Sequence, residues 1–157
     1  EDVLWETHLM VKEPINWIEK SIFIGSHRIV GQVEQMSSRE RFVEAVKETG
    51  AEAGLAWDIE TKIGEIPTET DIVLLLGRKA GFGDRKFDEK VWQKVGKLNK
   101  LKQNSDYNFK IALDGGVNAT NIIKAKEMGV EIAYCGKSVF DGKVKDNLDK
   151  LIYAGKN

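Results

Sequence analysis

Short apolar runs alternate with longer amphipathic segments along the chain. Six runs have the length and composition of buried β-strands: residues 3–10, 28–34, 52–57, 71–77, 109–114 and 131–135. Runs rich in Val, Ile and Leu and separated by helices are typical of parallel strands that are covered on at least one side. The repeated strand–helix order therefore predicts an α/β fold with a parallel sheet.

Proline, capping residues and glycine mark the predicted helix boundaries. One helix begins near Pro14 and ends at Gly25, and the next follows a capping box formed by Ser37 and Glu40 and ends at Gly50. Apolar spacing predicts a helix over 87–102, with Phe87, Val91, Val95 and Leu98 on one face, and a last helix with Val144, Leu148, Leu151 and Ile152 together. Asn118 is the predicted cap of a helix over 119–128, and segment 61–69 is expected to form one short helical turn.

Both an open doubly wound sheet and a barrel fit this order, and the pattern within the strands favours the barrel. Alternate residues of 109–114 are either strongly apolar (Phe109, Ile111, Leu113) or small and charged (Lys110, Ala112, Asp114). A mixed inner face suits the interior and mouth of a (β/α)8 TIM-type barrel better than a sheet that is apolar on both faces.

The composition is that of an ordinary globular protein. Of 157 residues, 41% are hydrophobic and 31% charged, with a formal net charge of −1. This balance favours neither nucleic acid nor an anionic membrane as a partner, and no apolar run approaches the roughly 18 residues of a membrane span. The single cysteine, Cys135, excludes an internal disulfide, and with no signal-like segment we expect a cytoplasmic location.

Candidate chemistry lies at the ends of the later strands. Asp114 ends the run 109–114 and is followed at once by Gly115 and Gly116. Because the active face of such barrels is at the carboxyl ends of the strands, we expect this carboxylate to face the mouth. The two glycines let the backbone approach a ligand closely. This arrangement predicts a base beside an anion site.

Two other loops and the first strand add to this site. After the last strand, Gly136, Lys137 and Ser138 predict a phosphate-binding loop. Segment 79–87 (KAGFGDRKF) indicates a lid over the mouth. His8 lies near the end of the first strand, and Met10 follows two residues later. His8 and Asp114 are therefore candidate ligands of a divalent metal ion, and such a site would need further donors.

These stretches resemble the ribulose-phosphate 3-epimerase family. The matching segments are THLMVKEPINWI (7–18), AGLAWDIET (53–61), DIVLLLGRKAGFGDRKF (71–87), KIALDGGVNATNI (110–122) and YCGKSVF (134–140), in the order and spacing of the family. The resemblance implies a (β/α)8 barrel that interconverts ribulose 5-phosphate and xylulose 5-phosphate. It implies two aspartates that exchange a proton at C3, and a divalent metal ion such as zinc, iron, manganese or cobalt.

The resemblance also assigns roles to residues. It implies that His8 is a metal ligand, and that Asp114 is both a metal ligand and one of the two acid/base aspartates. Met10 would line the site and Gly81, Phe82 and Gly83 would form the lid. The phosphate would be held by Gly115, Gly116, Gly136 and Lys137.

The chain departs from the family pattern in several places. It begins at what looks like the third strand of the family, so that the second aspartate, a further metal histidine and a serine are missing. Gln32 or Gly31 falls near a usual histidine, Lys137 replaces serine, Leu76 replaces methionine and Asp84 adds a charge to the lid. We therefore expect residues 1–157 to be one barrel domain without its first two βα units.

Two rival functions remain open at this point. A lyase or decarboxylase that acts on a sugar phosphate would need a lysine among its reacting groups, and Lys110 lies toward the wrong end of its strand. A non-catalytic phosphate-binding protein would suit the missing strands. Whatever the function, the open edges of strands 3–10 and 131–135 favour association, including with a second copy of the chain.

Overall fold

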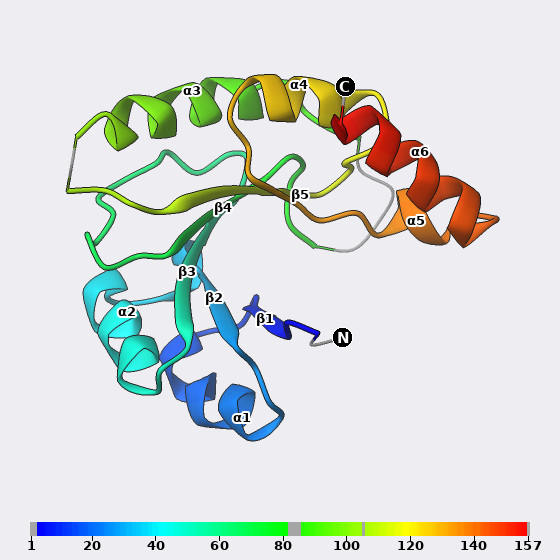
Figure 1. Cartoon of the computed structure of the whole chain (residues 1–157). Helices are drawn as coiled ribbons and strands as arrows, with labels where there is room; N and C mark the ends of the chain where they lie inside the picture. Colours follow the sequence, from blue (N-terminus) through cyan, green and yellow to red (C-terminus); the bar gives the residue numbers. More distant parts are fainter. Residues whose placement is uncertain (1–2, 82–85, 105, 157) are drawn as a thin grey trace.

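The computed structural model describes residues 3–81, 86–104 and 106–156, and it contains one curled parallel sheet (Figure 1). Its strands are β1 (Glu6–Leu9), β2 (Arg28–Gln32), β3 (Glu52–Trp57), β4 (Ile72–Leu76), β5 (Lys110–Asp114) and β6 (Ile132–Ala133). Each strand pairs in parallel with the next one along the chain, in the order β1-β2-β3-β4-β5-β6. A doubly wound sheet would reverse its order at a switch point. The predicted incomplete (β/α) barrel is confirmed.

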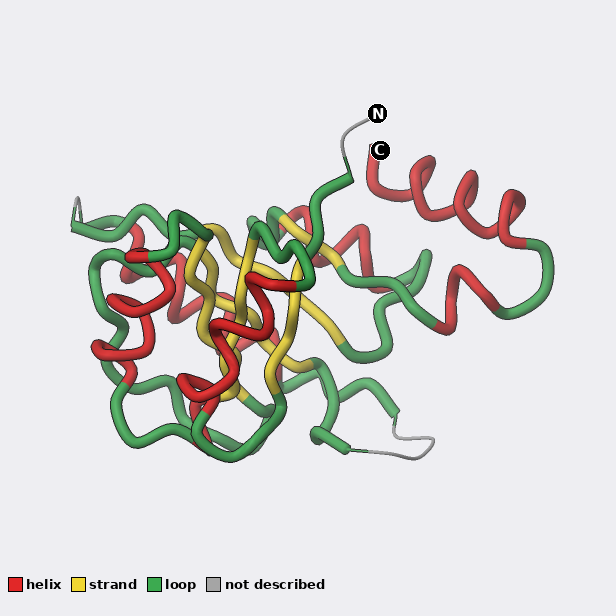
Figure 2. Tube along the Cα trace, turned by 90° about the horizontal axis from the view of Figure 1, so that it is seen from below, coloured by secondary structure: helices red, strands yellow, loops and turns green. Residues whose placement is uncertain are grey.

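Helices cover the convex side of the sheet, and Figure 2 shows the strands gathered between them. The helical elements are η1 (Pro14–Trp17), α1 (Ile18–Phe23), η2 (Val33–Gln35), α2 (Arg39–Glu48), α3 (Val91–Lys102), α4 (Asn121–Glu127), α5 (Lys137–Phe140) and α6 (Val144–Lys156). Among the residues described, no helix is both long and apolar enough to cross a membrane.

Most predicted boundaries agree with the structure within a few residues. The edge strands β1 and β6 are shorter than predicted, because each has a hydrogen-bonding neighbour on one side only. The cap of α2 is Ser38 and not Ser37, since the Ser38 hydroxyl accepts the Arg41 N–H. The N-cap of α4 is Thr120, and the predicted cap Asn118 lies two residues earlier, where its Oδ1 accepts the N–H groups of Thr120 and Asn121.

The prediction of a helical turn at 61–69 is wrong, because this segment contains no helix. Pro67 restricts the backbone of the residue before it to extended conformations. That residue, Ile66, is buried in the core. Side chains from two helices hold the segment instead: Arg39 donates to the Glu65 carbonyl at 3.0 Å, and Lys94 to the Thr61 carbonyl at 2.5 Å.

The two faces of the sheet carry different cores. The larger cluster lies between strands and helices and includes Ile29, Leu55, Val73, Ile111 and Leu113. A smaller cluster fills the concave face with Val30, Ala56, Ile72, Leu74 and Ala112. Because side chains alternate along each strand, the small and polar positions of the predicted inner face do point to the barrel interior.

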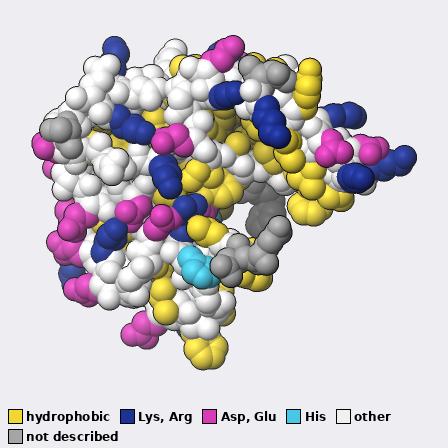
Figure 3. Space-filling model, viewed as in Figure 1, with side chains coloured by type: hydrophobic (Ala, Val, Ile, Leu, Met, Phe, Trp, Pro, Cys, Tyr) yellow, Lys and Arg dark blue, Asp and Glu magenta, His cyan; other side chains and the backbone are white. Residues whose placement is uncertain are grey.

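The apolar face predicted for the last helix is largely exposed. In α6 only Leu151 and Ala154 are buried, whereas Ile152 is 52% exposed. The helix packs against α4 and α5 (Figure 1). Its remaining apolar side chains contribute to the yellow surface beside α5 and α6 in Figure 3.

Candidate functional site

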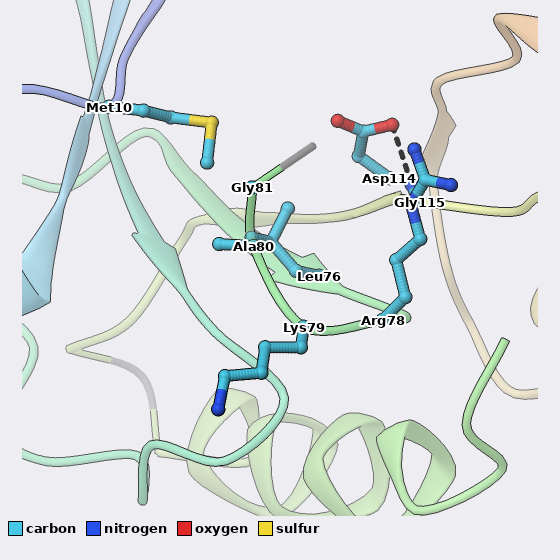
Figure 4. A pocket seen from close by; sticks show the side chains of 8 residues that line it. All are labelled: Met10, Leu76, Arg78, Lys79, Ala80, Gly81, Asp114 and Gly115. Atoms are coloured by element: carbon cyan, nitrogen blue, oxygen red, sulfur yellow. Dashed lines mark hydrogen bonds between the residues drawn. The ribbon is translucent and has the colours of Figure 1, made fainter. Parts of the chain in front are cut away.

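A cavity of about 460 Å³ opens at the carboxyl ends of the strands (Figure 4). Four residues of its lining were predicted from the sequence as parts of one site: Met10, Gly81, Asp114 and Gly115. Met10 follows edge strand β1, whereas Asp114 ends β5, so that the curvature of the sheet brings distant strands to one opening. The other lining residues are Leu76, Arg78, Lys79 and Ala80, from the end of β4 and the loop after it.

Asp114 is half-buried at the wall of this cavity. Its Oδ1 accepts the N–H of Gly115 at 2.6 Å. Gly115 and Gly116 have φ angles of +88° and +91°, a region that residues with a Cβ rarely adopt, so that the chain can turn sharply directly after the carboxylate. The Gly115 N–H is therefore occupied by the aspartate, which leaves the second carboxylate oxygen as the acceptor available to a ligand.

Asp114 also acts on the neighbouring strand electrostatically. Burial raises the pKa of the Cys135 thiol and the negative charge of Asp114 raises it further, against the opposing effect of a hydrogen bond with Ser138. A raised pKa keeps the thiol protonated and unreactive at neutral pH. Cys135 is partly buried and packs against the larger core cluster.

His8 is fixed by a row of side chains that begins on the next strand. Its Nε2 lies 2.9 Å from Oε1 of Gln32, and Nε2 of Gln32 donates to Glu34 at 2.6 Å. Because an ionised carboxylate only accepts, the Gln32 amide group must face Glu34, and its carbonyl oxygen must face His8. In the neutral tautomer that this contact favours, Nε2 of His8 carries the proton and Nδ1 keeps its lone pair.

Strand register shows how His8 and Asp114 relate. His8 pairs with Val30, and the register continues through Gly54 and Ile72 to Lys110, four strands away. His8 is thus in register with the first residue of β5, whereas Asp114 is the last residue of that strand. Met10, which follows β1, lines the cavity together with Asp114.

The described residues do not form a metal site by themselves. Within 3–81, 86–104 and 106–156, no three His, Cys, Asp or Glu side chains lie close enough together to hold an ion. Of the two predicted ligands, His8 offers Nδ1 and Asp114 one carboxylate oxygen, and the coordination of a divalent ion requires more donors than these. The prediction that His8 and Asp114 are metal ligands stays a prediction.

Of the other predicted site residues that the structure describes, His8, Gly116, Gly136 and Lys137 do not line the cavity. Gly116 packs against Phe87. A Cβ added at position 116 would lie 3.4 Å from the Cβ of Phe87. Gly136 and Lys137 lie at the start of α5. Phe82 and Gly83 of the predicted lid lie outside the described residues.

Sequence reasoning missed the basic residues of the cavity wall and a polar cluster inside the barrel. Arg28 forms ion pairs with Glu6 at 3.0 Å and with Glu52 at 2.5 Å, and the Tyr134 hydroxyl donates to Glu6. Burial lowers the pKa of Arg28, but the hydrogen bonds to Glu52 and Glu6 outweigh it and raise the pKa. Burial and Glu6 together raise the pKa of Tyr134. This cluster joins strands at opposite edges of the sheet.

Comparison with known proteins agrees with the motifs. The model of the ribulose-phosphate 3-epimerase family matches residues 1–140. The chain is 27% identical over 141 residues to ribulose-phosphate 3-epimerase of Aquifex aeolicus, covering 88% of this chain and 64% of the relative. It is 31% identical over 160 residues to the chloroplastic enzyme of Arabidopsis thaliana, covering 99% and 57%. The chain thus spans somewhat less than two thirds of the length of these relatives.

Solved structures show the same fold at low sequence identity. KGPDC from Streptococcus mutans superposes with a TM-score of 0.69 at 11% identity, over 99% of this chain and 73% of that one. A mutant tryptophan synthase alpha-subunit from Pyrococcus furiosus gives 0.61 at 14% identity, over 88% and 59%. With the family model matching most of its length, the chain belongs to the ribulose-phosphate 3-epimerase family.

Proposed function

We propose that this chain provides the substrate cavity and one acid/base group of a ribulose-phosphate 3-epimerase, which interconverts D-ribulose 5-phosphate and D-xylulose 5-phosphate. The observation that supports this proposal is the position of Asp114: it ends a strand of an epimerase-family barrel and lines a cavity together with Met10 and Gly115. A cavity of about 460 Å³ is in the range of small-ligand sites.

Asp114 would remove the proton at C3, because this carbon lies next to the substrate carbonyl. Oδ1 is held by the Gly115 N–H, so that the other oxygen is oriented toward the ligand. Epimerisation requires the proton to return on the opposite face, which one carboxylate cannot reach. A second acid/base group is therefore needed, and we place it outside the residues described.

A divalent metal ion, if bound, would supply Lewis-acid stabilisation of negative charge next to C3. His8 and Asp114 would supply two of its donors, and the rest would come from elsewhere. We further propose a cytoplasmic location, a small sugar phosphate as partner and association of copies through the open sheet edges.

Deuterium exchange tests the role of Asp114. The 157-residue chain, supplied with a divalent ion, is incubated in D₂O with each epimer separately, and proton NMR follows C3. With one base on one face, we expect deuterium to enter C3 of one epimer faster than the epimers interconvert. Asp114→Asn should abolish this exchange. Exchange at the same rate in Asp114→Asn would show that another group takes the proton.

A non-catalytic phosphate-binding protein is the second candidate. It is favoured by a specific observation: among the described residues, Asp114 is the acid that lines the cavity, and too few donors for a metal surround it. Failure of the wild-type chain to exchange C3 while it still binds phosphate would support this candidate. The hypothesis of a lyase has less support, because Lys110 begins β5 at the end opposite to Asp114 and does not line the cavity.

A further inference from the structure

Arg78 is a cation in the cavity wall for which the described part of the chain provides no partner. Among the described residues its side chain forms no ion pair or hydrogen bond, and it is only partly exposed. The neighbouring Lys79 is different, because its ammonium group pairs with Glu60 at 2.8 Å. A guanidinium is always charged and presents five N–H donors. Such a group at the wall of a cavity is complementary to an anionic acceptor.

The backbone on both sides of Arg78 is anchored. The Gly77 N–H donates to the Asp114 carbonyl at 2.7 Å, and the Ala80 N–H donates to Oδ2 of Asp58 at 2.7 Å. The side chain then runs past Gly115 (Figure 4). A Cβ added at position 115 would lie only 2.9 Å from the Cγ of Arg78. Gly115 therefore leaves the space in which Arg78 lies, and the guanidinium is held beside the cavity.

Arg78 and Asp114 are complementary to different groups of one ligand. Asp114 offers a free carboxylate oxygen, which accepts a hydroxyl or reacts with a C–H acid, whereas Arg78 only donates. No ion pair joins the two side chains, so that neither satisfies the other. A small molecule with hydroxyl groups at one end and an anionic group at the other would satisfy both.

We propose that Arg78 determines the specificity of this site by binding the phosphate group of the ligand. The identity of the sugar part rests on the function proposed above, but the phosphate contact does not. A planar guanidinium fork matches the oxygens of a phosphate in a bidentate manner. This assigns a phosphate contact to the loop after β4.

Titrations of the 157-residue chain test this assignment. Inorganic phosphate and ribulose 5-phosphate are titrated separately while protein NMR spectra are recorded for the wild type, Arg78→Met, Arg78→Lys and Arg41→Met. The last variant is the matched control, because Arg41 is an exposed arginine on α2, away from the cavity. Arg78→Met should weaken the binding of both ligands by about 10- to 100-fold, the range of one charge-assisted contact. Arg78→Lys should fall between, and Arg41→Met should change binding by less than about threefold.

Equal affinities in the wild type and Arg78→Met, with unchanged spectra elsewhere, would overturn the assignment, as would the absence of phosphate binding to the wild type. A similar loss in Arg41→Met would reduce the effect to net charge and overturn it too. The two proposals can fail separately. Binding that depends on Arg78 without exchange at C3 would refute the epimerase role alone, and exchange that is insensitive to Arg78→Met would refute the phosphate contact alone.

Discussion

Removing the arginine from the polar cluster inside the barrel should destabilise the fold strongly. Arg28→Met keeps most of the aliphatic length of the side chain but deletes the charge that two glutamates share. The Glu6 side chain is only 12% exposed, whereas that of Glu52 is 41% exposed. Among the residues that the structure describes, the variant therefore leaves the Glu6 carboxylate in the barrel interior with the Tyr134 hydroxyl as its one partner.

The two pairs contribute very different amounts. Loss of a buried partner that leaves an uncompensated charge costs about 3–5 kcal/mol, whereas a largely exposed pair contributes about 0–1 kcal/mol. Arg28→Met should thus lose about 3–5 kcal/mol of a total free energy of unfolding of about 5–15 kcal/mol. With a urea m-value of about 2 kcal/mol/M, the unfolding midpoint should fall by roughly 2 M.

Two companion variants make the assay decisive. Glu52→Gln should lose no more than about 1 kcal/mol in the same urea titration. Arg28→Met combined with Glu6→Gln should recover part of the loss, because a neutral amide still accepts the Tyr134 hydroxyl without an unpaired charge. If Arg28→Met and Glu52→Gln lose the same amount, or if Glu6→Gln recovers nothing, the burial of Glu6 is not the source of the effect.

Two further predictions concern the site and the pH dependence. Gly115→Ala should lower the free energy of unfolding by about 1–2 kcal/mol in a urea titration, because φ at this position is +88°. It should also weaken phosphate binding, because the added Cβ would displace Arg78. Unchanged stability would contradict the expected backbone strain. Burial raises the pKa of Glu131, but its hydrogen bonds to Lys102 and to the Ile111 N–H outweigh this and lower the pKa. This interaction therefore stabilises the fold above about pH 4.3, the ordinary glutamate value, and is lost as the pH falls through the lower folded value. Glu131→Gln should flatten the fall in stability at acidic pH by up to about 1 kcal/mol, and identical pH profiles would refute this.

Local patterns determined much of this protein. The runs of Val, Ile and Leu predicted all six strands, because alternation along a strand follows from burial on a pleated surface. The position of Asp114 at a strand end, followed by two glycines, was enough to predict a carboxylate at the mouth. Short-range chemistry of this kind involves neighbours in the chain, so that it is visible in the sequence.

The tertiary structure decided which distant residues meet. Tyr134 contacts Glu6, 128 residues earlier in the chain, only because the sheet curls until its edges face one another. Sequence spacing likewise gave no sign that Gln32 would orient His8, or that Arg78 would lie beside Gly115. These contacts depend on strand stagger and curvature, which are properties of the whole sheet and not of any single segment.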